Sequence, residues 1–153
     1  MRLTSESGEL KKFRSETSEF QQTFKTPLQN LHRFVETFLS PFRVDHGFVA
    51  LEQVVFDPDN LIEMLKGHSI SVEHCYGALI AADSTDEVLQ LLEATLSDWI
   101  DFIFVPKPRT FSIYADHDEW ITFYTNNAVE LARITNALTN AGFEAIPGWK
   151  RQL

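Results

Sequence analysis

The sequence has one cysteine, few glycines and no long hydrophobic run. Cys75 is alone among 153 residues, so no disulfide can form within the chain. With six glycines, the chain holds no Gly-rich phosphate loop, nucleophile elbow or dinucleotide-binding fingerprint. No apolar run reaches the roughly 18 residues of a membrane span, and residues 1–18 lack the apolar centre of a signal peptide. These absences predict a cytoplasmic protein with no membrane contact and no cofactor.

Positive charge is also scarce. Thirteen Lys and Arg stand against 22 Asp and Glu, a net charge of −9, which argues against nucleic acid as a partner because phosphate contacts need clustered basic side chains. The excess is central, since residues 61–105 hold one basic and eight acidic side chains. A field of one sign favours a basic protein partner and speeds association with it. The other interpretation is that the charge keeps the protein soluble.

Residues 110–125 alternate apolar and polar side chains around an acidic tip, which predicts a β-hairpin. Strand side chains alternate between two faces, so the loop length decides which residues share a face. This parity favours a three-residue loop of Asp116, His117 and Asp118, because Ile113 then pairs with Ile121 and one face becomes wholly apolar. The opposite face then carries Ser112, Tyr114, Trp120, Thr122 and Tyr124.

The predicted fold class is α+β, with a helical N-terminal two thirds followed by a small antiparallel sheet. The helices are expected at residues 8–24, 27–39, 58–66, 72–80 and 85–101. Residues 42–56 match neither the helical nor the strand period of apolar residues. The hairpin at 110–125, a helix at 127–141 and a strand at 143–147 complete the fold, with the helix on the apolar face of the hairpin. The length fits a single domain, 1–153.

The first two predicted helices leave two interpretations open. Their apolar stripes either pack on the same domain or form a homodimer contact, because three-four spacing is shared by both arrangements. Ser and Glu are frequent in residues 1–9, a composition typical of a disordered arm.

The hairpin tip is the first candidate site. Asp116, His117 and Asp118 are residue types that bind divalent cations, and loops held by rigid strands often carry sites. Neighbouring tip side chains point to different sides, however, and Asp is also an ordinary turn residue. A metal or general-base site, a solvated turn and a tip that contacts a partner therefore remain open.

Two further surfaces are candidates for partner binding. Tyr and Trp supply large contact areas with a polar end, and an acidic helix face suits a basic partner. The aromatic candidates are Tyr114, Trp120 and Tyr124 on the polar hairpin face, which either form a binding surface or pack under the N-terminal helices. The acidic candidates are Asp86, Glu87, Glu93, Asp98 and Asp101 on the longest predicted helix.

Two functions follow from these features. The first is a non-catalytic acidic interaction protein, such as an immunity or inhibitor-like protein, that presents residues 86–101 to a basic partner. The alternative is a small metal-dependent enzyme or small-ligand-binding protein centred on residues 116–119.

Overall fold

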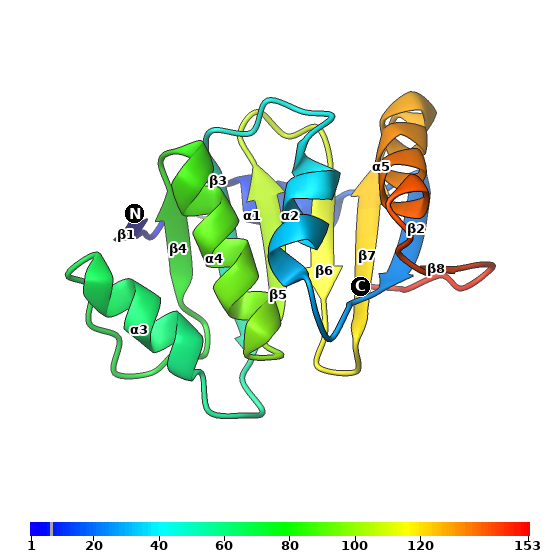
Figure 1. Cartoon of the computed structure of the whole chain (residues 1–153). Helices are drawn as coiled ribbons and strands as arrows, with labels where there is room; N and C mark the ends of the chain where they lie inside the picture. The colour runs from blue at the N-terminus through cyan, green and yellow to red at the C-terminus, as the bar shows by residue number, and fades with distance from the viewer. Residues whose placement is uncertain (7) are drawn as a thin grey trace.

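The computed structural model describes residues 1–6 and 8–153, and its strands form one eight-stranded antiparallel sheet (Figure 1). The elements in chain order are β1 (Arg2–Leu3), α1 (Gly8–Ser15), β2 (Phe20–Lys25), α2 (Leu31–Leu39), β3 (Gly47–Gln53), α3 (Asp59–Gly67), β4 (Leu79–Ala82), α4 (Thr85–Ser97), β5 (Asp101–Pro106), β6 (Ser112–Ala115), β7 (Trp120–Thr125), α5 (Ala128–Asn140) and β8 (Ala145–Ile146). The order in the sheet is β1-β4-β3-β5-β6-β7-β2-β8.

The main core lies between the sheet and three helices. Helices α2, α4 and α5 cover one face of the sheet, with α3 beside α4 (Figure 1). Phenylalanine fills much of this layer, and Phe38 packs edge-on against Phe123 with ring centroids 5.2 Å apart. The fully buried phenylalanines are Phe24, Phe34, Phe38, Phe102, Phe104, Phe111 and Phe123. Burial of so much aromatic surface is the main force that holds the helices on the sheet.

The opposite sheet face, which we call the second face, has a smaller core. Helix α1 lies on this face, away from the other helices (Figure 1). Phe13 of α1 is buried and meets Tyr124 with ring centroids 5.6 Å apart. Ala50, Ile103 and Val105 complete this second cluster. The apolar stripe of α1 therefore packs within the chain, and a homodimer through the N-terminal helices stays a prediction.

The predicted helical N-terminal two thirds is wrong, because β1 to β4 lie within it. The sheet has eight strands instead of a hairpin and one added strand. Residues 42–56, which fitted neither period, contain β3, and the 72–80 segment is a loop that leads into β4. Gly77 in that loop has a φ of +75°, which a helix does not allow.

Strand β2 was mistaken for the second half of a helix. Phe20 and Phe24 are four residues apart, and a spacing of four places side chains on one face of a helix and also on one face of a strand. The three-residue steps from Leu10 to Phe13 and from Thr17 to Phe20 favour a helix, but α1 ends between them at Ser15. The four-residue spacing of Phe20 and Phe24 fits a helix and a strand equally, so it does not indicate where the helix gives way to a strand.

Helix α4 ends earlier than predicted, so Asp101 belongs to β5. Trp99 has a φ of +52°, and the backbone N–H of Ile100 donates to the Thr95 carbonyl at 3.1 Å. This is a left-handed helix end that glycine usually provides. Because a tryptophan stands there, no stop signal was visible in the sequence.

The start of α2 was also predicted too early. Residues 26–29 match a helix-start pattern, but the helix begins at Leu31, after Asn30 with a φ of +63°. By contrast, Ser84 and Asn127 do begin their helices. The Ser84 hydroxyl accepts from the backbone N–H of Glu87, and the Asn127 side chain accepts from that of Val129.

The hairpin has the predicted faces in a different register. Ile113 pairs with Phe123 and Ala115 with Ile121, two residues beyond the predicted partners. The backbone N–H of Asp116 donates to the Trp120 carbonyl at 3.0 Å, so the three-residue loop is 117–119. Glu119 takes the left-handed position near its end, with a φ of +69°. A shift of two leaves every side chain on its predicted face.

Both edges of the sheet are short, since β1 and β8 have two residues each. Short edge strands limit pairing with other chains. Among the described residues, no helix combines the length and the apolar character that crossing a membrane requires.

Candidate functional site

The hairpin tip holds a histidine-carboxylate pair. Asp101 begins β5, which runs antiparallel to β6, so its side chain lies at the tip end of the second face. Its Oδ1 accepts from the backbone N–H of His117 at 2.8 Å and lies 2.7 Å from His117 Nδ1. Because a carboxylate only accepts, Nδ1 carries the proton. The pair fixes the orientation of the imidazole and leaves Nε2 on the outer side.

The pKa of His117 is raised, chiefly by this hydrogen bond to Asp101. Because the pKa is raised on folding, the pair contributes its full stabilisation at a pH below about 6.5, the pKa of histidine in the unfolded chain. This stabilisation is lost as the pH rises through the pKa of His117 in the folded protein. We expect the His117 titration followed by NMR to have its midpoint above 6.5 in the wild type and nearer 6.5 in Asp101→Asn. His32, whose pKa Glu93 raises instead, is the internal control and should titrate alike in both proteins. Equal His117 midpoints would contradict the pairing.

Asp116 bonds both the hairpin loop and the C-terminal segment, residues 148–153. Its Oδ1 accepts from the backbone N–H groups of Asp118 and Trp120 at 3.0 and 3.1 Å, and its Oδ2 pairs with Arg151. Asp118 is exposed, with Oδ1 3.8 Å from His117 Nε2. Asp116 is therefore paired with Arg151 and His117 with Asp101, while Asp118 lies near His117 only. Across residues 1–6 and 8–153, no group of three or more His, Cys, Asp or Glu side chains is placed to hold a metal ion.

Residues 148–153 fold over the second face, a feature that sequence reasoning missed. The Gln21 side chain bonds the backbone of Arg151 at both its N–H and its carbonyl, at 2.8 and 3.1 Å. The Arg151 guanidinium lies 4.5 Å from the Tyr114 ring centroid and 5.1 Å from that of Trp149. No spacing pattern marks these contacts, because they join residues far apart in the sequence.

The three predicted aromatic residues differ in how far they are covered. Tyr124 is buried under Phe13, and Tyr114 is half-buried under Arg151. Trp120 meets Trp149 edge-on, with centroids 4.5 Å apart. All three share the second face, as parity predicted, and packing within the chain already uses most of their surface.

Two of the five predicted acidic residues serve inside the fold. Asp98 is 5% exposed, and its carboxylate accepts from the Asn60 backbone N–H at 3.2 Å, the Asn60 amide at 2.6 Å and the Leu61 backbone N–H at 2.8 Å. It thereby caps the first turn of α3, since Pro58 provides no side-chain cap. Asp101 is equally buried at 5% and pairs with His117.

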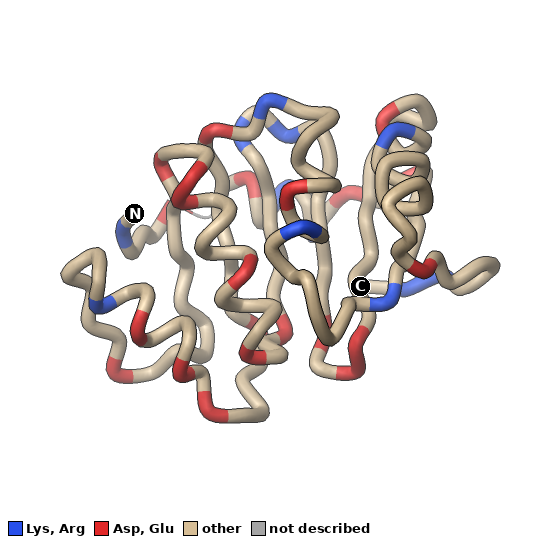
Figure 2. The backbone as a smooth tube through the Cα atoms, viewed as in Figure 1, with Lys and Arg blue, Asp and Glu red and all other residues tan. Residues whose placement is uncertain are grey.

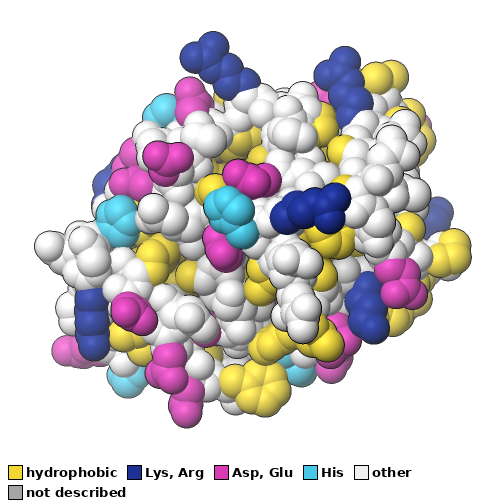
Figure 3. Space-filling view, in the orientation of Figure 1, with side chains coloured by type: hydrophobic (Ala, Val, Ile, Leu, Met, Phe, Trp, Pro, Cys, Tyr) yellow, Lys and Arg dark blue, Asp and Glu magenta, His cyan; other side chains and the backbone are white. Residues whose placement is uncertain are grey.

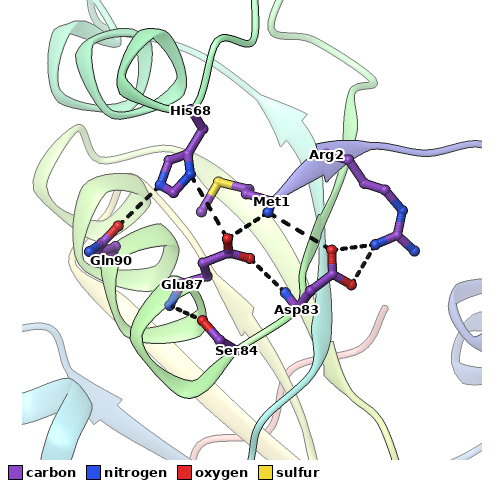
Figure 4. Close-up of polar contacts among 7 residues, drawn as sticks. All are labelled: Met1, Arg2, His68, Asp83, Ser84, Glu87 and Gln90. Atoms are coloured by element: carbon purple, nitrogen blue, oxygen red, sulfur yellow. Dashed lines mark hydrogen bonds and ion pairs between the residues drawn. The ribbon is translucent and has the colours of Figure 1, made fainter.

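Glu87 takes part in a polar cluster between β1 and α4 (Figure 4). Its Oε1 lies 2.6 Å from the Met1 ammonium, and its Oε2 accepts from the Asp83 backbone N–H at 2.8 Å. The ammonium contact is the main reason why the pKa of Glu87 is lowered. His68 Nδ1 lies 3.9 Å from the same Oε1, and Arg2 pairs with Asp83. The Met1 ammonium and Arg2 thus balance the negative charges of Glu87 and Asp83 at the start of α4.

Some of the other exposed acids are spread along the side of the molecule formed by α3 and α4 (Figures 2 and 3). The two helices run antiparallel, since Asn60 bonds Asp98 at one end and His68 Nε2 lies 3.2 Å from Gln90 at the other. We define the acidic patch as Asp57, Asp59, Glu63, Glu73 and Asp86, all of them exposed. Glu93, in the middle of α4, is half-buried and pairs with His32 at 3.0 Å.

Comparison of the chain with family models, with curated proteins and with solved structures finds no match. The function is therefore argued from the residues alone.

Proposed function

We propose that this protein binds a basic protein partner through the acidic patch, in the manner of an immunity or inhibitor-like protein and without catalysis. The patch keeps the acidic surface predicted from the sequence but moves its centre from the α4 stripe to α3, the first turn of α4 and the flanking loops. Asp98 and Asp101 leave the predicted set because the fold uses both internally.

One observation carries the proposal: within the described chain, none of the five patch carboxylates has a Lys, Arg or His nitrogen within 4.0 Å. Several acids elsewhere are paired, as in Arg14 with Glu52 and Arg109 with Glu16, and others, such as Glu19 and Glu144, are unpaired as the patch acids are. Lys66 is the one basic residue between 61 and 105. Unpaired charges of one sign leave a field that attracts and orients a basic surface.

The test compares two triple variants with equal changes in net charge. The patch variant is Asp57→Asn, Glu63→Gln and Asp86→Asn, and the control variant neutralises the exposed acids Glu6, Glu19 and Glu144. Each protein is immobilised and incubated with extract of its source cells at about 0.05 M and about 0.5 M salt, which changes the screening length about threefold.

We expect the wild type and the control variant to retain the same basic protein at low salt only, and the patch variant to retain little of it. Equal capture by both variants, or capture that salt does not weaken, would refute the proposal.

A further inference from the structure

Two large apolar side chains stand exposed within the acidic patch. Val55 is 45% exposed and Phe56 is 55% exposed, and both belong to the loop 54–58 that joins β3 to α3. Among the exposed large apolar residues of the described chain, only these two are neighbours in the sequence. Single apolar side chains are common on protein surfaces, whereas adjoining ones with a polar rim are typical of contact sites. We call Val55 and Phe56 the apolar pair.

The loop that carries the apolar pair is held at both ends. Val54 follows β3 directly, and its side chain packs against the main core. At the other end, the Asp98 carboxylate accepts from the backbone N–H groups of Asn60 and Leu61 at 3.2 and 2.8 Å. A short loop between two fixed ends has few conformations. Binding through the apolar pair therefore costs less conformational entropy than binding through a free segment would.

Acidic side chains border the apolar pair on the side of α3. Asp57 follows Phe56 directly, and Asp59 and Glu63 lie about one turn apart on α3, all three exposed. Residues 44–65 contain no Lys or Arg, and the loop from β3 to α3 carries an acid and no basic residue in Figure 2. Protein interfaces commonly have an apolar centre and a polar rim of complementary charge. The partner surface that fits here has an apolar centre with Lys or Arg around it.

From these features we propose that Val55 and Phe56 are the apolar anchor of the interface with the basic partner. The partner covers the pair with an apolar side chain and places Lys or Arg side chains against Asp57, Asp59 and Glu63. Charge alone attracts any basic surface, so the apolar contact selects which basic proteins bind. This inference rests on the proposed function, because it takes a basic partner as given and names the residues that choose among such partners.

The test uses two synthetic peptides of equal length and equal positive charge as probes. One combines Lys with Leu and the other combines Lys with Ser. Each peptide is titrated into the whole isotope-labelled chain, and its dissociation constant is measured from the shifts of the backbone amide signals in NMR spectra. We expect the Lys-Leu peptide to bind at least about tenfold more tightly than the Lys-Ser peptide, the effect of burying one large apolar side chain. Its largest shifts should fall on the amides of Val55 and Phe56.

Two double variants assign this preference to the apolar pair. Val55→Ser with Phe56→Ser should bring the two peptides to within about twofold of each other and leave the affinity for the Lys-Ser peptide unchanged. Leu28→Ser with Val129→Ser removes two other exposed apolar side chains, one in the loop before α2 and one in the first turn of α5. This control should bind both peptides as the wild type does.

Equal affinity of the wild type for the two peptides would overturn the inference and leave the acidic patch without an apolar anchor. A Lys-Leu preference that survives in Val55→Ser with Phe56→Ser would overturn it as well, and so would absence of binding by the Lys-Leu peptide.

The patch variant distinguishes this inference from the proposed function on which it rests. Neutralising the patch should weaken the binding of both peptides at least about tenfold and leave the ratio between them unchanged. If the patch variant bound both peptides as the wild type does, the proposed function would be refuted, whatever the ratio between the peptides.

Discussion

Asp98→Ala should lower the free energy of unfolding by about 3 kcal/mol. Its carboxylate accepts three hydrogen bonds from Asn60 and Leu61 and is 5% exposed. Hydrogen bonds to a charged group contribute about 1.5–3 kcal/mol each, and truncation leaves buried donors unpaired at the start of α3. Denaturant unfolding followed by circular dichroism measures the effect.

Two further variants separate capping from charge. Asp98→Asn keeps one carbonyl acceptor and should lose about half as much stability. Asp86→Ala removes an exposed acid from the first turn of α4, so it should cost no more than about 1 kcal/mol, the size of a helix-dipole effect. If Asp98→Ala unfolded within about 0.5 kcal/mol of the wild type, Asp98 would not be the cap of α3.

Arg151→Met should have the next largest effect, also about 3 kcal/mol. The side chain of Arg151 is 14% exposed and that of its partner Asp116 is 10% exposed, so the change leaves a nearly buried carboxylate without its counter-ion. Breaking a buried pair in this way costs about 3–5 kcal/mol, and we expect the lower end because the C-terminal segment can move and admit water. The stacking on Tyr114 and Trp149 is lost as well.

A double-mutant cycle isolates the ion pair. Asp116→Asn keeps an acceptor for the loop N–H groups, and combined with Arg151→Met it should cost about 1–3 kcal/mol less than the sum of the single changes. Lys150→Met makes the same kind of change at an exposed neighbour and should have little effect. Strict additivity of the two single variants would show that the C-terminal segment is not held by this pair.

Local signals predicted part of the fold. The starts of α4 and α5 followed from Ser84 and Asn127, whose side chains bond N–H groups two or three residues ahead. The faces of the hairpin followed from parity, which survives a register shift of two. Such features depend on residues that are near in the sequence, and the residues alone therefore specify them.

The rest depends on contacts between distant residues. Strand β2 pairs with β7, about one hundred residues later, and nothing within Phe20–Lys25 records that partner. Asp98 and Asp101 fitted a helical acidic stripe, yet the left-handed Trp99 turns the chain between them and both become internal. In the candidate site, the tip residues were predicted, but Arg151 was not, because its contacts with Gln21 and Asp116 span 130 and 35 residues.

The association rate of the captured partner tests the role of the acidic patch most directly. The rate is measured by surface plasmon resonance at low and high salt for the wild type, the patch variant and the control variant. We expect the patch variant to associate at least about tenfold more slowly than the other two proteins at low salt, and the three rates to converge at high salt. Equal rates for all three proteins at low salt would contradict that role.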